Sequence, residues 1–152
     1  MAEAFINILL VEDNPDDIEI TKRAFKEAKL LNKLYIVRDG QEAVDFLFHQ
    51  GVYNDPLNAP KPGLVLLDIN MPKMNGTEVL KRIKEDNVLK TIPVVMLTVS
   101  KRDEDIVRSY NYGCNSFIQK PVEFDKFVEL IKEIGLYWGI HNIPSVNGGY
   151  NA

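Results

Sequence analysis

The chain has 152 residues, a length that predicts one domain able to bury an ordinary hydrophobic core. Its 18 Lys and Arg against 22 Asp and Glu give a formal net charge of −4, which argues against binding nucleic acid through the overall field, because that binding needs basic residues. The single cysteine, Cys114, excludes an internal disulfide, and with only two histidines a zinc site is not expected.

The chain shows no targeting or membrane segment. The apolar run at 5–11 is far shorter than the roughly 20 residues that a membrane helix needs. It also lacks the basic region and the small-residue cleavage site of a signal peptide. We therefore expect a cytoplasmic protein that does not associate with membranes.

Short apolar runs alternate with segments whose apolar residues recur at helical spacing. The runs predict buried strands at 6–11, 34–37, 63–68, 93–98 and 116–119. Helices are predicted at about 15–29, after Asp39-Gly40, after Gly76, near 103–112 and from Phe124 onward. Residues 49–62 are expected to form a loop and 137–152 a tail. The alternation predicts an α/β fold, a parallel sheet with helices on both faces.

Polar residues follow four of the five predicted strands. Glu12 and Asp13 follow the first, Asp68 ends the third, Thr98 ends the fourth and Lys120 follows the fifth. Ligands of open parallel sheets bind at the carboxyl ends of the strands, so these side chains are expected to meet at one edge. Each residue alone is more often a turn, a cap or a solvated group; their coincidence at one edge favours a functional site.

Three carboxylates at one edge repel one another unless a cation is present. Oxygen ligands without His or Cys favour a hard cation, and Mg²⁺ is the natural candidate. Lys120 and Thr98 would suit an incoming phosphoryl group. An aspartate can itself be the nucleophile in phosphoryl transfer, and Asp68 is the candidate because it stands alone at its strand end.

Four segments resemble the signatures of two-component response-regulator receiver domains: VEDNPDD, LLDINMPKMNG, PVVMLTVS and FIQKP. The resemblance covers about residues 6–135 and implies a flavodoxin-like (βα)5 fold, a doubly wound five-stranded parallel sheet of order 2-1-3-4-5. The segments NPDD, 50–62, NSFIQKPVEFDKF and IGLYWGIHNIP are most similar to the small regulators paired with phytochrome-type histidine kinases.

The resemblance also implies roles for individual residues. Asp68 would accept phosphate from a phosphohistidine, and Lys120 would bridge to the phosphoryl oxygen. Thr98 would hydrogen-bond the new phosphate, and Phe117 would be the aromatic switch whose ring turns inward. The implied Mg²⁺ ligands are Glu12, Asp13, Asp68 and the backbone carbonyl of Asn70. The family's cis peptide would lie at Lys120-Pro121.

Two positions depart from the family pattern. Val99 stands after Thr98, where the residue is often small, and is expected to narrow access to the phosphate. Phe117 replaces a commoner tyrosine, so no hydroxyl can form a hydrogen bond outside the pocket when the ring turns. Both affect the expected kinetics of switching and leave the phosphorylation site as predicted.

The resemblance predicts a receiver at 1–136 and a tail at 137–152, with signalling through the domain's own surface. A sensor histidine kinase is the expected partner, together with an unidentified downstream protein and no nucleic acid. The helix near 103–112, with mixed charges beside Tyr110 and Tyr112, is either an interface or a solvated face. Tyr137, Trp138 and Ile140 form either a homodimer seam or a packing segment. Cys114 is expected to be a buried small hydrophobe.

Two other functions compete with signalling. A Mg²⁺-dependent phosphohydrolase would use the same aspartyl phosphate, but Asn70 stands where its general acid is expected and no cap insertion is visible. A flavodoxin-like electron carrier needs a Ser/Thr/Gly-rich phosphate loop after its first strand. This chain has Glu-Asp-Asn-Pro-Asp-Asp there, which would repel the flavin phosphate.

Overall fold

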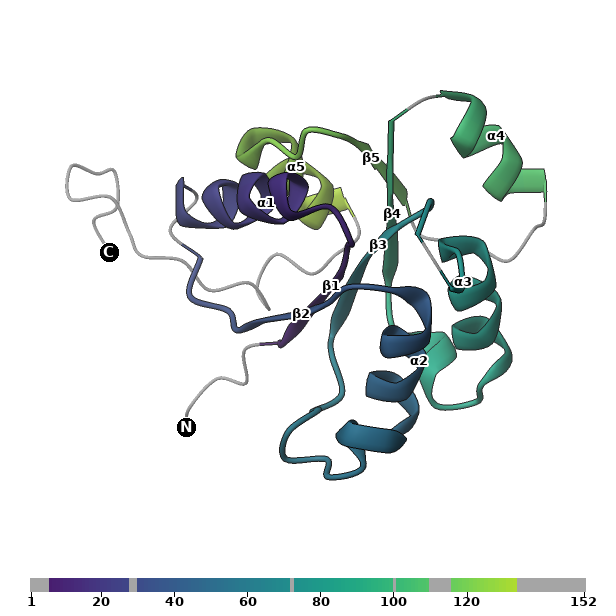
Figure 1. Ribbon diagram of the computed structural model, residues 1–152. Coiled ribbons are helices and arrows are strands. Elements are labelled where there is room, and N and C mark those ends of the chain that lie inside the picture. Colours follow the sequence, from purple (N-terminus) through teal and green to yellow (C-terminus); the bar gives the residue numbers. More distant parts are fainter. Residues whose placement is uncertain (1–5, 28–29, 72, 100, 110–115, 134–152) are drawn as a thin grey trace.

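A computed structural model describes residues 6–27, 30–71, 73–99, 101–109 and 116–133. Its strands are β1 (Ile8–Val11), β2 (Leu34–Val37), β3 (Leu64–Asp68), β4 (Val94–Thr98) and β5 (Ser116–Gln119). They form one parallel sheet of order β2-β1-β3-β4-β5 (Figure 1). Every residue of β1, β3 and β4 is buried, as expected for parallel strands covered on both faces. The predicted fold class is confirmed.

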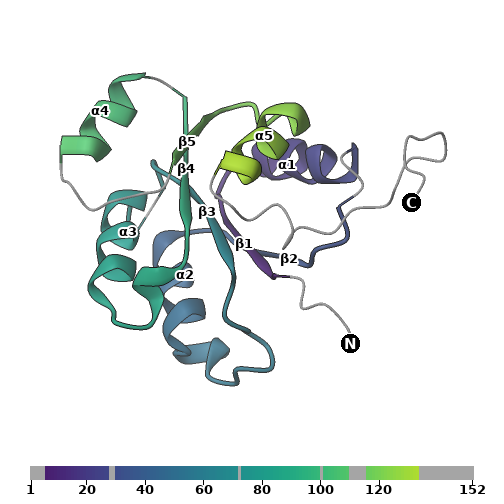
Figure 2. The same ribbon diagram turned by 180° about the vertical axis from the view of Figure 1, so that it is seen from behind.

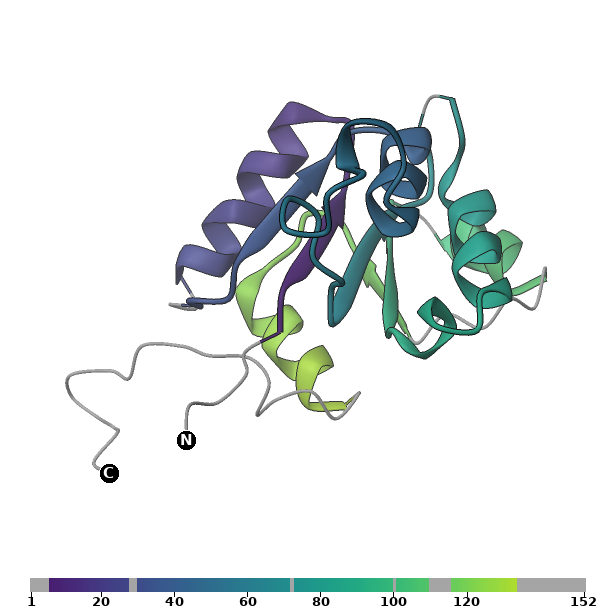
Figure 3. The same cartoon turned by 90° about the horizontal axis from the view of Figure 1, so that it is seen from below.

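Helices cover both faces of the sheet. They are α1 (Pro15–Glu27), α2 (Gly40–Phe48), α3 (Gly76–Glu85), α4 (Lys101–Ser109) and α5 (Phe124–Glu133). Helices α1 and α5 lie together on one face, and α2 and α3 lie on the other (Figures 1 and 2). Alternate strand residues fill the two cores: Leu9 and Val11 face α2 and α3, whereas Ile8 and Leu10 face α1 and α5. Figure 3, which views the molecule from below, shows the sheet between these layers.

Side-chain caps set where the helices begin. Asn14 Oδ1 accepts hydrogen bonds from the backbone N–H groups of Asp16 and Asp17 at the start of α1. Asp39 caps α2 and Asn75 caps α3 in the same way, because the first N–H groups of a helix have no partner within it. The predicted helix at 15–29 is described to Glu27, and the helix predicted near 103–112 begins at Lys101. The sequence therefore predicts the start of this helix about two residues too late.

The expected loop at 49–62 contains a short 3-10 helix, η1 (Gly51–Tyr53). The Tyr53 hydroxyl donates to Glu42 Oε2 at 2.6 Å, and burial together with this bond raises the pKa of Tyr53 to about 12. His49 Nε2 lies 2.8 Å from the Ala59 carbonyl oxygen. A second 3-10 helix, η2 (Leu89–Thr91), precedes β4. Tyr53 thus ties the loop to α2, and the His49–Ala59 contact joins the two ends of the loop to each other.

Several predictions fall outside the described residues. They concern the tail at 137–152 with Tyr137, Trp138 and Ile140, the cysteine Cys114, and the aromatic residues Tyr110 and Tyr112. Among the described residues, no helix combines the length and the hydropathy needed to span a bilayer.

Candidate functional site

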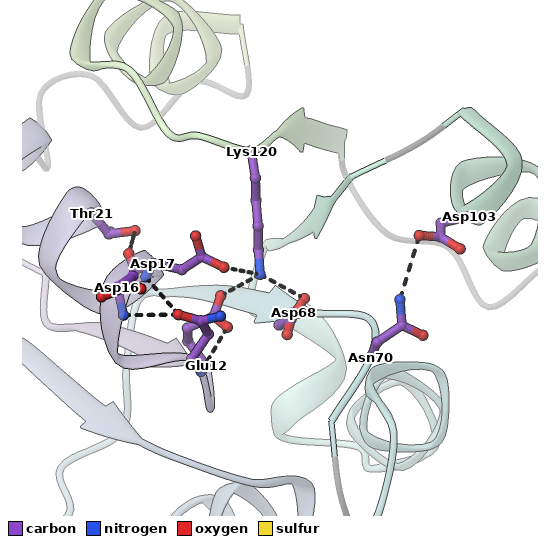
Figure 4. Close-up of polar contacts among 9 residues, drawn as sticks. Glu12, Asp16, Asp17, Thr21, Asp68, Asn70, Asp103 and Lys120 are labelled. Atoms are coloured by element: carbon purple, nitrogen blue, oxygen red, sulfur yellow. Dashed lines mark hydrogen bonds and ion pairs between the residues drawn. The ribbon is translucent and has the colours of Figure 1, made fainter.

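The parallel strands bring the predicted site residues to one edge of the sheet. In the register, Asp68 pairs with Leu97 and Thr98 with Gln119, so β3, β4 and β5 end at similar heights. The Lys120 backbone N–H donates to the Thr98 carbonyl oxygen at 2.8 Å and continues the ladder by one residue. The Lys120 side chain then reaches across the strand ends towards Glu12 and Asp68 (Figure 4).

Lys120 is the centre of the site. Its Nζ lies 2.7 Å from Glu12 Oε1, 3.0 Å from Asp17 Oδ2 and 3.1 Å from Asp68 Oδ1. Only 10% of its side chain is exposed, so these contacts are poorly screened by water. The peptide bond between Lys120 and Pro121 is cis, as the resemblance implies.

Three carboxylates form a group that could hold a metal ion. Each of Glu12, Asp13 and Asp68 offers an oxygen, and these oxygens all lie within 4.8 Å of one another. Glu12 and Asp68 are buried, whereas Asp13 is exposed and leaves the group open to solvent on one side. An all-oxygen donor set suits a hard divalent cation. The predicted cluster of carboxylates is therefore present, and its chemistry fits a divalent metal.

Burial and mutual charge shift the proton affinities of the buried pair. Burial, helped by the charge of Asp68, raises the pKa of Glu12 to about 7 even though the Lys120 ammonium opposes the shift. The pKa of Asp68 is also raised by burial, and Lys120 opposes the shift there as well. Burial alone would lower the pKa of Lys120, but the carboxylates around it raise the pKa above its usual value. Without a metal, the site holds more negative charge than one ammonium neutralises.

The two predicted switch residues lie on the neighbouring strands β4 and β5. Thr98 is buried at the end of β4. Phe117 on β5 pairs with Met96 and is half-buried against the core that α2 and α3 cover. Val99 is 60% exposed, at the surface beyond the end of β4.

Asn70 lies two residues beyond Asp68, in the loop between β3 and α3. Its side-chain amide donates to Asp103 Oδ2 on α4 at 3.4 Å, a contact that the sequence did not predict (Figure 4). This bond uses only the side-chain amide of Asn70. The atom of Asn70 that is predicted to bind a metal ion is its backbone carbonyl oxygen. The same bond connects the loop after the candidate acceptor with the first turn of α4.

Asp17 is a site residue that sequence reasoning missed. A carboxylate in the first turn of a helix is usually explained by the positive end of the helix dipole alone, yet the Asp17 carboxylate accepts a hydrogen bond from Lys120 Nζ. The available signal was its place in the first turn of α1, which begins directly after the strand end that carries Glu12 and Asp13. Because Asp17 and Lys120 are 103 residues apart in the sequence, local sequence patterns could not predict their contact.

Comparison with known proteins agrees with this arrangement. Residues 8–132 match the response regulator receiver domain family, and the chain belongs to that family. It is therefore a signalling response-regulator receiver of the two-component class, and the family match sets aside the electron-carrier and phosphohydrolase alternatives.

Its relatives include several regulators associated with phytochromes. The chain is 39% identical to the response regulator Rcp1 of Synechocystis sp. over 86% of its own length and 87% of that protein. A solved structure of Rcp1 in its Mn²⁺-bound form has a TM-score of 0.70 at 38% identity, covering 88% of this chain and 94% of that one. The bacteriophytochrome response regulator AtBRR superposes with a TM-score of 0.82 at 46% identity, covering 90% of this chain and 96% of that one. The structure of the phosphorylated cyanobacterial phytochrome response regulator RcpA has a TM-score of 0.71 at 40% identity, covering 89% of this chain and 94% of that one.

Proposed function

We propose that this receiver accepts a phosphoryl group on Asp68 from a phosphohistidine of a sensor histidine kinase, with Mg²⁺ held in the same site. The observation that carries the proposal is the position of Asp68. Its Oδ1 lies 3.1 Å from Lys120 Nζ, and its carboxylate is within reach of two further carboxylates that can hold a cation. A relative of this family, RcpA, has a solved phosphorylated structure, which supports the same chemistry here.

The transfer step follows from the groups present. A carboxylate oxygen of Asp68 attacks phosphorus, and the P–N bond to the histidine breaks. The electron pair of that bond stays on the imidazole nitrogen, and the departing imidazole leaves neutral after taking up a proton. Lys120 is placed to donate to a phosphoryl oxygen, so it would stabilise the negative charge on the phosphoryl oxygens.

The proposed metal ligands are oxygen atoms of residues in the carboxylate group and of the loop after β3. Glu12, Asp13 and Asp68 would hold Mg²⁺ through carboxylate oxygens, and Asn70 would add its backbone carbonyl. Bound there, the cation would offset charge on the phosphoryl oxygens and on the carboxylates themselves. That a Mn²⁺-bound form of Rcp1 exists supports a divalent ion in this receiver, and Mg²⁺ is our assignment because the ligands are all oxygens.

Release of the phosphoryl group would use the same residues. Water attacks phosphorus, the P–O bond to Asp68 breaks, and the aspartate and inorganic phosphate are the products. While the acyl phosphate persists, Thr98 would hydrogen-bond a phosphoryl oxygen and Phe117 would turn inward behind it. The added charge of about −1.5 to −2 would in this way shift the population of the strand ends from one conformation to another.

The partner that we propose is a kinase of the phytochrome type, because similar regulators are named for phytochromes. The proposed receiver spans 1–136, and the tail at 137–152 stays a predicted packing or homodimer segment. Sedimentation with and without a phosphoryl analogue tests the dimer, and a monomer in both states contradicts it.

Labelling with acetyl phosphate tests the acceptor. Wild type with Mg²⁺ should gain one phosphoryl group, and Asp68→Asn or removal of Mg²⁺ with EDTA should abolish the gain. Asp105→Asn, an exposed aspartate on α4, is the matched control and should be labelled like wild type. Labelling of Asp68→Asn at another residue contradicts the assignment. Transfer rates from a panel of histidine kinases then test the partner: a phytochrome-type kinase should be the fastest.

A further inference from the structure

Three carboxylate oxygens already surround the Lys120 ammonium, and the contact with Asp17 is a hydrogen bond of 3.0 Å. The three oxygens within 3.1 Å belong to Glu12, Asp17 and Asp68. An ammonium has three donors and no more. A phosphoryl oxygen on Asp68 therefore competes with the present oxygens for the ammonium.

Asp68 itself becomes part of the acyl phosphate, so the comparison that matters is the cost of losing Lys120 at Glu12 and at Asp17. The side chain of Glu12 is fully buried and that of Asp68 is 8% exposed, whereas that of Asp17 is 26% exposed. A buried carboxylate that loses its cation keeps a large desolvation cost, but a partly exposed one is hydrated instead. Asp17 also lies in the first turn of α1, where the positive end of the helix favours its charge. Asp17 is thus the partner that can leave Lys120 at the least cost.

We propose that Asp17 is a positioning residue that holds Lys120 in the unphosphorylated receiver and gives up the ammonium to the phosphoryl oxygen on Asp68. This inference rests on the proposed function of Asp68. Asp17 then competes with the phosphoryl group for Lys120, and its negative charge also opposes the arriving anion. Both effects make the phosphorylated state less favourable than Lys120, Glu12 and Asp68 alone would make it.

Binding of beryllium fluoride, a phosphoryl analogue, tests the competition without chemistry. The full chain is titrated by calorimetry at saturating Mg²⁺. Asp17→Asn should bind the analogue about two- to fivefold more tightly than wild type, the range expected for a partly exposed ion pair. Asp17→Ser, a second variant that removes the carboxylate, should do the same. Asp17→Glu keeps the charge and should return the affinity towards the wild-type value.

Asp16→Asn is the matched control. Asp16 lies in the same first turn and is exposed, and the substitution removes the same charge from the same helix end. A role of Asp17 in α1 alone predicts equal effects of the two substitutions, whereas the competition predicts that only Asp17→Asn tightens binding. Equal affinities of Asp17→Asn and Asp16→Asn, or weaker binding by Asp17→Asn, overturn the inference. Wild type that binds no analogue overturns the proposed function itself.

Discussion

The Nζ of Lys120 lies 2.7 Å from Oε1 of Glu12, the shortest of its three carboxylate contacts and the one most deeply buried. Glu12 comes from the end of β1 and Lys120 from the end of β5, with β3 and β4 between them in the sheet. The pair therefore spans the edge on which Asp68 lies. We expect its charge balance to affect the stability of the metal-free protein as well as the proposed chemistry.

Replacing Lys120 with methionine should destabilise the metal-free protein in a pH-dependent way. Methionine keeps an apolar stem but leaves Glu12 without its cation, and breaking a buried pair typically costs about 3–5 kcal/mol. The loss should be greatest near pH 8 and smaller near pH 5, where Glu12 takes up a proton. Urea unfolding in EDTA measures both values.

The control for this change is Lys126→Met. Lys126 forms an exposed ion pair with Glu123 at 3.2 Å, and such pairs contribute about 1 kcal/mol or less. Equal losses for the two variants, or a loss at Lys120 that does not change with pH, would show that the Glu12 pair does not carry the effect.

Glu12→Gln should remove part of the pH dependence of folding. The pKa of Glu12 is raised from 4.5 to about 7 in the folded state, so the folded protein binds more protons than the unfolded chain between these values. The free energy of unfolding of wild type therefore falls as pH rises through this window, and the loss is complete above about pH 7. Relative to Glu12→Gln, we expect wild type to lose about 1–3 kcal/mol between pH 4.5 and pH 8.

Chemical denaturation of the metal-free variants across this pH range measures the effect. Glu129→Gln, an exposed carboxylate on α5, is the control and should follow wild type at every pH. A constant difference between wild type and Glu12→Gln would mean that Glu12 stays ionised in the folded state.

Thr98→Ala should separate phosphorylation from signalling. The buried hydroxyl of Thr98 ends β4, so its loss should leave the sheet intact while the response of β5 to beryllium fluoride is largely lost. Thr98→Ser keeps the hydroxyl and should keep the response. Amide chemical shifts around Phe117, with and without the analogue, measure this. Thr91→Ala, at an exposed threonine, is the control, and a full response in Thr98→Ala would contradict the proposed switch.

Gly76→Ala should disturb the backbone of the acceptor. A Cβ at Gly76 would lie 2.1 Å from the Asp68 carbonyl oxygen and 2.9 Å from Ile69 Cα, so the backbone must move. We expect a destabilisation of about 2–4 kcal/mol together with weaker labelling of Asp68. Gly51→Ala meets only Asp45 Oδ2 at 3.7 Å, and its cost arises from a φ of +58°, about 1 kcal/mol. Denaturant unfolding compares the two, and a smaller loss at Gly76 than at Gly51 would contradict the close packing.

Local patterns were enough to predict the strands and the edge at which the site lies. The buried run from Ile8 to Val11 and the run ending at Asp68 are apolar throughout, which is typical of parallel strands covered on both faces. Since all such strands end at the same edge, the meeting of Glu12, Asp68 and Lys120 followed from the order of the elements. Local patterns do not mark every helix end, since α4 begins at Lys101 with charged residues and without an apolar one.

Sequence by itself therefore determined the fold class, the residues at the carboxyl edge and the family that they resemble. Only the tertiary structure decided which of the carboxylates share Lys120. Asp16 and Asp17 are adjacent and chemically identical, yet only Asp17 reaches Lys120, because the direction of a side chain on α1 depends on how that helix packs against the sheet and α5. Burial, which separates Glu12 from Asp13 and raises the pKa of Glu12, arises in the same way from packing between segments distant in the chain.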